Sequence, residues 1–569
     1  MSCRWVLAFV LIFLAGCHEP TPAENLSMPT PMPTPIPIPT PVPTPMPTPE
    51  PTPAPVPKVV FSHSGGLYTE PIRLNLDASI AFDAIYYTLD GSEPSPGTSR
   101  KFTSAIPIRD RTPEANVLSA IPGYRIGCFE VYYRDYFIPP EEPVFKGTVV
   151  RARAFNSDGE PLTPIATHSF FVYEGIFERY AGLPIVSVAT DADNFFDDET
   201  GIYVNWNWEM RGREWERPAH VEIFDESERA VAMDMGVRIH GSGSRRLAQK
   251  ALRLYARDEP VKHDIFQGRS DVSQFGRLLL RNAGNEGNGT MFRDAGMQYL
   301  SRNLHLHTQA ARPAVVFLNG EFWGLYNIRE RYDDHYIASR YPVRRRDVAM
   351  LEFTAGSGTE LSAGSESDRL DFIALEEFIQ SDDFDIEVAE QYMDFASFTD
   401  FYIANIFFGN IDWPGNNVRM WRYNGDHPDM DNRWRWMLVD LDSTTGYFFG
   451  FNYYEDNLIR LLDPEQGDNR SQERHTFVFR RLMEDDGFRE NFVRRFTELM
   501  ETDFHYEAFL AMVEEFSERI RHVMPEQIER FGRIESMEAW EEELDILRTF
   551  AVRRQEYMLR FLEEHFGLY

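Results

Sequence analysis

Alternation of apolar and polar residues is the first clear pattern beyond the proline-rich beginning of the chain. In "GTVVRARAFNSDGEP", Val150, Ala152 and Ala154 alternate with arginines, which is the two-residue period of a half-buried strand. That segment and "AIYYTLDGSEPS" both contain Asp-Gly, a pair typical of tight turns. Short strands at this spacing predict an immunoglobulin-like all-β module over residues 58–175.

Farther along the chain, strand patterns give way to helical ones. "PAVVFLNGEFWGLYNI" predicts a hairpin that turns at Asn319-Gly320. After Asp371, apolar residues recur at three- and four-residue steps, which is the period of amphipathic helices. We therefore expect an α+β domain over residues 181–470, followed by an acidic helical region over residues 471–569 that packs on it.

A polar loop interrupts the apolar pattern in "FFGNIDWPGNNVRMW". A helix is expected to end before this loop, and a strand is expected to begin after it. "NVRMWRY", the turn "NGDHPDMDN" and "RWRWMLVDLD" together predict a hairpin. Because a hairpin brings its two ends together, Asp412, Asn417 and Asp440 should converge, with Asp442 close by.

The first residues of the chain follow a different pattern. Residues 1–16 contain one arginine and an apolar run of about ten residues, too short to span a membrane, which predicts an export signal. "LAGC" looks like a bacterial lipobox and implies lipidation of Cys17; an ordinary signal peptide with a chance cysteine is the alternative. Every second residue from Pro29 to Pro57 is proline, so residues 17–57 are expected to form an extended stalk.

Composition narrows the choice of partners. With 57 basic and 90 acidic residues the chain has a formal charge of −33, which repels nucleic acid, so no nucleic-acid partner is expected. Of three cysteines, one lies in the predicted signal and one is Cys17, which excludes a disulfide framework within the monomer.

The residues at the predicted hairpin end are of the kinds that phosphoryl transfer requires. Magnesium prefers carboxylate and amide oxygens, and an acid must orient the attacking hydroxyl. Protein kinases place an Asp and an Asn five residues apart in one loop, with a metal-binding Asp after a hairpin. Asp412, Asn417 and Asp440 repeat that order, although "HRD" and "DFG" are absent. The alternative is structural, with Asp412 capping a turn and Asp440 forming an ion pair.

A glycine-serine turn upstream offers groups that can hold phosphates. In "RIHGSGSRRLAQKALRL", backbone N–H groups and hydroxyls can cradle phosphate oxygens, and nearby cations add positive charge; a plain β-turn is the alternative. Glu330 is a candidate ion-pair partner for Lys250. The candidate nucleotide-binding residues are Ser242, Gly243, Ser244, Arg245, Lys250, Arg253 and Arg281.

Five motifs taken together resemble the CotH family, the spore-coat protein H kinases. They are "RIHGSGSRRLAQKALRL", "RNAGNEGNGTMFRDA", "VFLNGEFWGLYNIRERYDDHYI", "NIDWPGNNVRMWRY" and "WRWMLVDLDSTTG". The resemblance implies a divergent protein-kinase-like fold that uses ATP and Mg (or Mn) to phosphorylate Ser or Thr of proteins, this chain included. It also implies roles for single residues: catalytic for Asp412, Lys250 and Glu330, and metal-binding for Asn417, Asp440 and Asp442.

One difference from the family and one further resemblance bear on this hypothesis. Family members usually carry a longer "DSY" segment where this chain has "DWPGNN", which leaves open whether Asn416 or Asn417 meets the metal. The β module resembles the C-terminal module of chitobiases, which implies a spacer or a module that contacts glycan or the cell wall.

The patterns predict an exported lipoprotein anchored by Cys17 in the outer membrane or at the cell surface, and the resemblance implies that it has CotH-type kinase activity. An alternative from another class is a non-catalytic surface or cell-wall binding protein that recognises glycan or a protein partner. Glycoside hydrolysis is a third hypothesis, and it rests only on the chitobiase-like module.

Overall fold

The computed structural model describes most of the chain beyond residue 55. The described residues are 56–123, 125–126, 137–269, 272–354, 358–447, 452–463 and 474–567. The predicted export signal, Cys17 and all but the end of the predicted stalk lie outside these ranges. Val56–Tyr569 group into one unit.

The N-terminal part of this unit is built from strands, as the alternating pattern predicts. Its main sheet has the order β2-β9-β8-β5-β6, while β1 pairs with β4 and β3 pairs with β7. Val150, Ala152 and Ala154 of β8 all belong to one apolar core, so the two-residue period is confirmed. The strands are β1 (Val59–Phe61), β2 (Gly66–Tyr68), β3 (Ile72–Leu74), β4 (Leu76–Ala78), β5 (Ala84–Thr88), β6 (Arg100–Lys101), β7 (Ile106–Ile108), β8 (Thr148–Phe155) and β9 (Ala166–Val172).

A closed barrel follows, and no sequence pattern predicted its closure. The strand order is β10-β11-β12-β13-β14-β16-β15, and the parallel pair β10–β15 completes the ring. The β15–β16 hairpin turns at Asn319 and Gly320, both at positive φ, as the Asn-Gly pair predicts. The strands are β10 (Ile185–Ala189), β11 (Arg217–Asp225), β12 (Glu228–Ile239), β13 (Leu252–Tyr255), β14 (Arg277–Arg281), β15 (Ala311–Leu318) and β16 (Glu321–Glu330).

Short helices connect the strands of the barrel. The glycine-serine turn of the sequence becomes a single 3₁₀ turn, η3, between β12 and β13. These connecting helices are α1 (Ile176–Arg179), α2 (Asp193–Phe196), η1 (Asn207–Glu209), η2 (Arg213–Trp215), η3 (Gly243–Arg246), η4 (Gly284–Glu286) and α3 (Arg293–Leu300).

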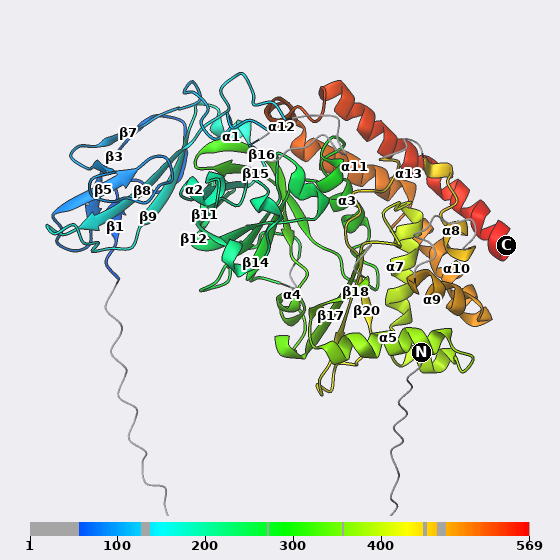
Figure 1. The fold of residues 1–569 in the computed structure, drawn as a ribbon. Helices are drawn as coiled ribbons and strands as arrows, with labels where there is room; N and C mark the ends of the chain where they lie inside the picture. The colour runs from blue at the N-terminus through cyan, green and yellow to red at the C-terminus, as the bar shows by residue number, and fades with distance from the viewer. Residues whose placement is uncertain are drawn as a thin grey trace, which may run out of the picture. The chain divides into compact units, whose positions relative to one another are not determined.

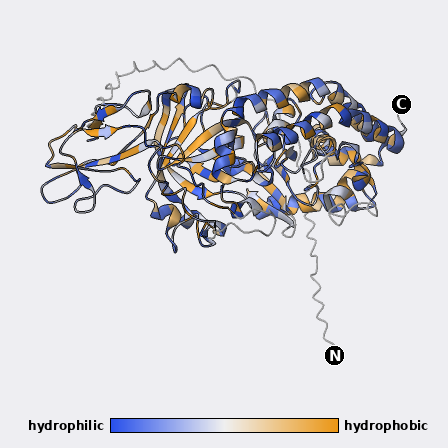
Figure 2. Ribbon diagram, turned by 90° about the horizontal axis from the view of Figure 1, so that it is seen from above, coloured by the Kyte–Doolittle hydropathy of each residue, from blue (hydrophilic) through white to orange (hydrophobic). Residues whose placement is uncertain are grey.

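Apolar side chains from alternate positions of the strands fill the barrel. Leu252 and Leu254 of β13 and Leu278 and Leu280 of β14 belong to this core. Figure 2 shows the barrel strands largely in the colour of hydrophobic residues. Because side chains alternate between the two faces of a strand, Arg253 must lie on the outer face.

A four-stranded sheet and several helices follow the barrel. Its order is β18-β17-β19-β20, and the predicted β19–β20 hairpin is confirmed by the pairing of Arg419 with Met437. Figure 1 shows this sheet beside α4 and α5. The elements are α4 (Asp334–Ala338), η5 (Arg345–Asp347), β17 (Val348–Thr354), β18 (Gly358–Ala363), α5 (Glu366–Gln380), α6 (Ile386–Glu390), α7 (Phe395–Phe407), β19 (Val418–Tyr423), β20 (Arg435–Met437), η6 (Asn452–Tyr454) and α8 (Ile459–Leu462).

The C-terminal helices pack on the preceding elements. Phe407 of α7, Phe504 after α10 and Phe550 of α13 share one apolar core, and Figure 1 shows α13 running beside α11. None of the helices that the structure describes combines the length and apolar character needed to cross a membrane. These last helices are α9 (Arg474–Met483), α10 (Asp486–Glu501), α11 (Tyr506–Arg521), α12 (Met524–Phe531) and α13 (Met537–Phe566).

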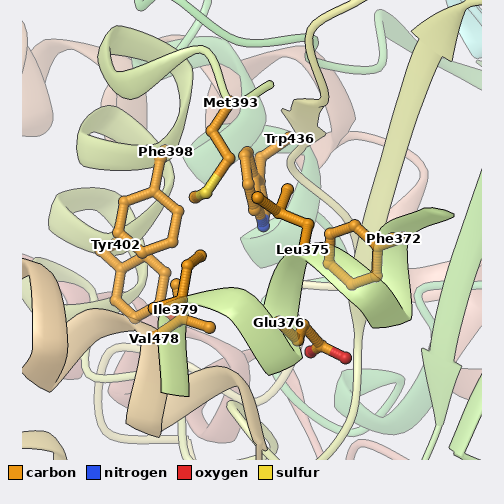
Figure 3. Close-up of a pocket in the computed structure, with 9 residues that line it drawn as sticks. All are labelled: Phe372, Leu375, Glu376, Ile379, Met393, Phe398, Tyr402, Trp436 and Val478. Carbon is orange, nitrogen blue, oxygen red and sulfur yellow. The ribbon is translucent and has the colours of Figure 1, made fainter. Parts of the chain in front are cut away.

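A small cavity lies in this core between α5 and α7. Its volume is about 10 Å³, room for one water molecule at most. Figure 3 shows the rings of Phe398, Tyr402 and Trp436 around it, with the Glu376 carboxylate pointing away from them. The cavity is a packing gap that is too small for a substrate.

One buried carboxylate ties the β module to the barrel. Glu321, at the start of β16, accepts hydrogen bonds from the backbone N–H groups of Val117 (2.7 Å) and Ser119 (2.7 Å). Its backbone also pairs with that of Lys146, just before β8. Glu321 is 6% exposed, so these charge-assisted hydrogen bonds lie out of reach of bulk water.

Replacing Glu321 with alanine should destabilise the unit, because two N–H donors lose a charged acceptor inside the fold. We expect the free energy of unfolding, measured by urea denaturation, to fall by about 2–3 kcal/mol. Glu360→Ala, at an exposed position on β18, is the control. It should change that free energy by less than about 0.5 kcal/mol. Equal losses in both variants would contradict the role assigned to Glu321.

Candidate functional site

The candidate site forms at one end of the β19–β20 hairpin. Because Arg419 of β19 is paired with β20, the residues just before β19 and just after β20 lie at the same end. The backbone N–H of Ile411 donates to the carbonyl of Ser443 (3.1 Å), which fastens the loop of Asp412 to the segment that follows Asp440. The hairpin therefore brings the two predicted acids into one region.

Two amides hold the Asp412 carboxylate. The Nδ2 groups of Asn416 and Asn417 each donate to Asp412 Oδ2 at 3.0 Å. The backbone N–H of Asp412 donates to Asn410 Oδ1 (3.1 Å), just beyond the end of α7. Asn417 has a φ of 59°, a left-handed conformation that asparagine tolerates better than most residues. Both amides contact the acid through nitrogen, and in the part of the chain that the structure describes neither Oδ1 atom accepts a hydrogen bond.

Three carboxylates converge on the guanidinium of Arg281, at the end of β14. Its Nη2 lies 2.5 Å from Asp440 Oδ1 and 3.3 Å from Asp442 Oδ2, and its Nε lies 3.1 Å from Asp294 Oδ2. Arg329 of β16 makes a second ion pair with Asp294. This largely buried network couples the barrel to the residues that follow β20.

Burial and neighbouring charge set the ionisation of this network. Burial, with the negative charge of Asp440, raises the pKa of Asp442 well above its usual value, despite Arg281. Burial alone would raise the pKa of Asp294, but Arg329 and Arg281 bring it below its usual value. Burial alone would lower the pKa of Arg281, but the three carboxylates raise it. The network therefore favours the ionised form of Asp294 and opposes that of Asp442.

A glycine-bearing loop borders Asp442. The backbone N–H of Asn285 donates to Asp442 Oδ2 (2.8 Å), and its Nδ2 lies 3.2 Å from Oδ1. Gly284 has a φ of 66°, and a Cβ there would collide with the Asp442 carboxylate. This loop is η4, and it lies against η3, the glycine-serine turn. The predicted phosphate-binding turn, with Ser242, Gly243 and Ser244, is thus a neighbour of the acids through η4; its contact with phosphate stays a prediction.

Lys250 and Arg245 donate to backbone carbonyls, whereas the sequence predicted that they contact phosphate. Lys250 is fully buried, and its ammonium donates to the carbonyls of Arg245 (2.7 Å) and Leu247 (2.9 Å). The buried guanidinium of Arg245 donates to the carbonyls of Trp208, Met210, Ile239 and Gly241. Both cations therefore stabilise the backbone around the turn, and their geometry does not support a direct contact with phosphate.

The predicted ion pair of Lys250 with Glu330 is wrong. Glu330, at the end of β16, is 3% exposed and pairs with Arg340, while Arg269 lies 3.6 Å away. It also accepts the backbone N–H of Ala310 (2.9 Å). Arginines therefore neutralise Glu330, and backbone carbonyls accept the hydrogen bonds of the Lys250 ammonium.

Oxygen atoms at the hairpin end are of the kinds that magnesium prefers. The side chain of Asp440 is 34% exposed, and its Oδ2 accepts no hydrogen bond from the part of the chain that the structure describes. Both oxygens of Asp442, in contrast, are engaged by Asn285, Arg281 and Ser443. Within the described ranges, no three His, Cys, Asp or Glu side chains are grouped for a metal ion. Magnesium takes one or two carboxylates and fills its other positions with water and phosphate, so one carboxylate such as that of Asp440 matches the kind of ligand it needs.

Arg554 of α13 anchors the helix that leads into the Asp412 loop. Its Nε and Nη2 donate to the carbonyls of Phe407 and Ile406 (2.9 Å each), in the last turn of α7. Its Nη1 donates to the carbonyls of Tyr453 (2.9 Å) and Glu455 (2.8 Å). Burial lowers the pKa of this arginine to about 9, and the negative end of the α7 dipole favours its charge.

Sequence reasoning missed Arg554 because its partners are backbone atoms far away in the chain. The basic pair Arg553-Arg554 in an acidic amphipathic helix was the available signal. Nothing in that pair distinguishes the exposed arginine from the buried one.

Comparison with known proteins gives two family matches. The family described as CotH kinase protein matches residues 237–558, more than half of the chain and a stretch that runs from β12 into α13. The family described as Chitobiase/beta-hexosaminidase C-terminal domain matches residues 63–121, within the β module. No curated protein is similar enough to the chain to match it.

Arg554→Met should destabilise the fold, because two buried and two partly buried carbonyls lose a charged donor. We expect a loss of about 3 kcal/mol in the free energy of unfolding. Arg553→Met is the matched control, since the neighbouring side chain is 45% exposed, pairs with Glu556 on its own helix and otherwise lies 5.6 Å from the centroid of the Tyr453 ring. Thermal unfolding of the two variants checks this, and similar midpoints would show that Arg554 does not anchor α7.

Proposed function

The chain belongs to the CotH kinase family, and on that premise we propose that it transfers the γ-phosphoryl group of ATP to Ser or Thr residues of proteins. The observation that carries the proposal is the arrangement at the β19–β20 hairpin. Asp412 is held there by two amides, and Asp440 follows the second strand. This arrangement offers an acceptor for a hydroxyl proton beside oxygen ligands for a metal.

Asp412 acts on the acceptor hydroxyl in this proposal. Asn416 and Asn417 fix the orientation of its carboxylate, which takes the proton of the Ser or Thr hydroxyl. As the hydroxyl oxygen bonds to the γ-phosphorus, the bond from that phosphorus to the β–γ bridging oxygen breaks. ADP leaves with the electron pair, and the proton remains on Asp412 until solvent removes it.

Asp440 and Asn417 are the residues that would hold magnesium or manganese. Such an ion, when bound, supplies positive charge at the β- and γ-phosphates. Asn416 offers the alternative amide oxygen, since both asparagines contact Asp412 in the same way. Arg281 supplies the positive charge at Asp440 in the structure described above.

A second candidate function is non-catalytic binding at the cell surface. It is favoured by Arg281, which already neutralises the acids that a metal would bind. The match of residues 63–121 to a chitobiase C-terminal domain suggests a glycan or cell-wall contact for the β module. A measurement of phosphoryl transfer distinguishes this candidate from the kinase, because a binding protein transfers no phosphoryl group.

Export and lipid anchoring complete the proposal. Cys17, after the apolar run of residues 1–16, would carry the lipid in the outer membrane or at the cell surface. The proline-rich segment would hold the folded unit away from the membrane, since polyproline II rises ~3.1 Å per residue.

Asp412→Asn should reduce phosphoryl transfer about 100- to 10,000-fold, because an amide cannot take the hydroxyl proton. Label from γ-³²P-ATP is measured in the purified full chain and in added Ser/Thr-containing protein, with Mg²⁺ or Mn²⁺. Asp440→Asn should also reduce the rate and raise the metal concentration required. Asp426→Asn, in the exposed turn of the same hairpin, is the control and should behave as wild type. Equal incorporation in all variants would refute the assigned roles, and none in wild type would favour the binding protein.

Cys17→Ser should release the protein from membranes, because the thiol that carries the lipid is gone. Fractionation of cells that express either form, followed by detection of the chain, checks this outcome. Membrane retention of the Cys17→Ser protein would contradict lipid anchoring.

A further inference from the structure

A groove of about 530 Å³ lies between α6, the first turns of α7 and α10. Figure 1 shows α10 close to α7, far from the label of β14 on the barrel. The groove is much larger than the packing gap beside α5, and its volume falls within the range of about 300–1,000 Å³ that small-molecule sites occupy. It therefore has room for a ligand.

Apolar side chains form part of the walls of the groove. Phe395, at the start of α7, and Phe488, in the first turn of α10, have ring centroids 5.4 Å apart and meet edge to face. Ile386 of α6 and Ala396 of α7 also line the groove. These side chains offer an apolar surface to methylene groups, and the face of an aromatic ring attracts cations.

A buried ion pair closes one part of the groove. The carboxylate of Asp400 accepts hydrogen bonds from Nε (2.8 Å) and Nη2 (3.0 Å) of Arg495, and it lies 3.0 Å from Nδ1 of His305. Arg495 also pairs with Glu498 (3.0 Å). These charges therefore balance one another, and none of them requires a ligand.

The remaining charged side chains leave the groove with an excess of negative charge. Glu387 and Glu390 stand three residues apart on one face of α6, and within the described ranges neither carboxylate lies at ion-pair distance from a basic group. Asp485 lines the groove too, and the guanidinium of Arg494 donates to Asn491 Oδ1 (3.1 Å). Of the charged residues in the lining, five are acids and two are arginines, an excess of three negative charges.

This combination of charge and apolar surface selects the kind of ligand. Like charges three residues apart on a helix repel each other, so a cation between Glu387 and Glu390 would relieve that repulsion. An inorganic cation would leave the apolar walls exposed to water. A ligand with several ammonium groups joined by methylene chains satisfies both parts of the lining.

We propose that this groove binds a linear aliphatic polyamine, a small molecule in which methylene chains separate two or more ammonium groups. Its ammonium groups pair with Glu387 and Glu390, and its methylene chain lies on Phe395 and Phe488. A basic polypeptide carries similar charge, but a stable protein interface covers about 800 Å² on each partner, whereas the volume of this groove is that of a small-molecule site. Binding requires neither ATP nor phosphoryl transfer, so this inference is independent of the proposed function.

Isothermal titration of the purified full chain tests the groove. The probes are spermine, spermidine, 1,4-diaminobutane, butylamine, 1,4-butanediol and tetralysine. We expect affinity to rise with the number of ammonium groups, and we expect no binding of the uncharged diol. Added sodium chloride should weaken the binding of spermine, because salt screens exposed charges.

Two kinds of variant separate charge from space. Glu387→Gln and Glu390→Gln should each weaken spermine binding about threefold, and the double variant about tenfold, as expected for ion pairs near the surface. Ala396→Trp should weaken it at least tenfold, because the indole fills part of the groove from an exposed position. Circular dichroism checks that each variant is folded.

The matched control is the double variant Glu377→Gln with Glu490→Gln. It removes the same net charge from exposed positions on α5 and α10 that do not line the groove, and it should bind spermine as wild type does.

The outcomes decide the assignment. No binding of spermine by wild type, or equal losses in the two double variants, would overturn it. Unchanged affinity in Ala396→Trp would also overturn it, because the ligand would then lie outside the groove. Tighter binding of tetralysine than of spermine would assign the groove to basic polypeptides and overturn the polyamine.

Discussion

Three carboxylates around one guanidinium, two of them buried and one partly exposed, are the constraint on which this structure depends. Asp294, Asp440 and Asp442 come from two distant parts of the chain, and Arg281 contacts all three. Buried acids cost several kcal/mol each when they lack a partner. The ion pairs of Arg281 offset that cost. They also link β14 of the barrel to the end of the β19–β20 hairpin.

The rest of the proposed site is arranged around this junction. On the acidic side, two amides orient Asp412, and Arg554 of α13 holds the helix that precedes it. On the basic side, carboxylates pair with arginines on the outer face of β12 and β14, and Arg253 of β13 donates to His240. The C-terminal helices thus contribute to the site through Arg554, which holds α7, and through Glu543 of α13, which pairs with Arg293.

Local sequence patterns predicted the elements of the hairpin but not the partners of the basic side chains. The Asn319-Gly320 turn, the alternation in β8 and the β19–β20 pair follow from nearby residues, and each is confirmed. Barrel closure depends on the parallel pairing of β10 with β15, which are far apart in the chain, so no local pattern reports it. Lys250 and Arg253 are three residues apart and equally basic in sequence. The structure turns Lys250 onto backbone carbonyls and Arg253 to the outer face, and only the register of the strands distinguishes them.

A crystal structure of the full chain with Mg²⁺ and a non-hydrolysable ATP analogue tests the central claim most directly. The account predicts a metal ion bound by Asp440 and by the Oδ1 of Asn416 or Asn417. It also predicts that the γ-phosphate faces the Asp412 carboxylate. A nucleotide bound elsewhere on the chain, or Asp440 without metal and still bonded to Arg281 at saturating nucleotide, would contradict it.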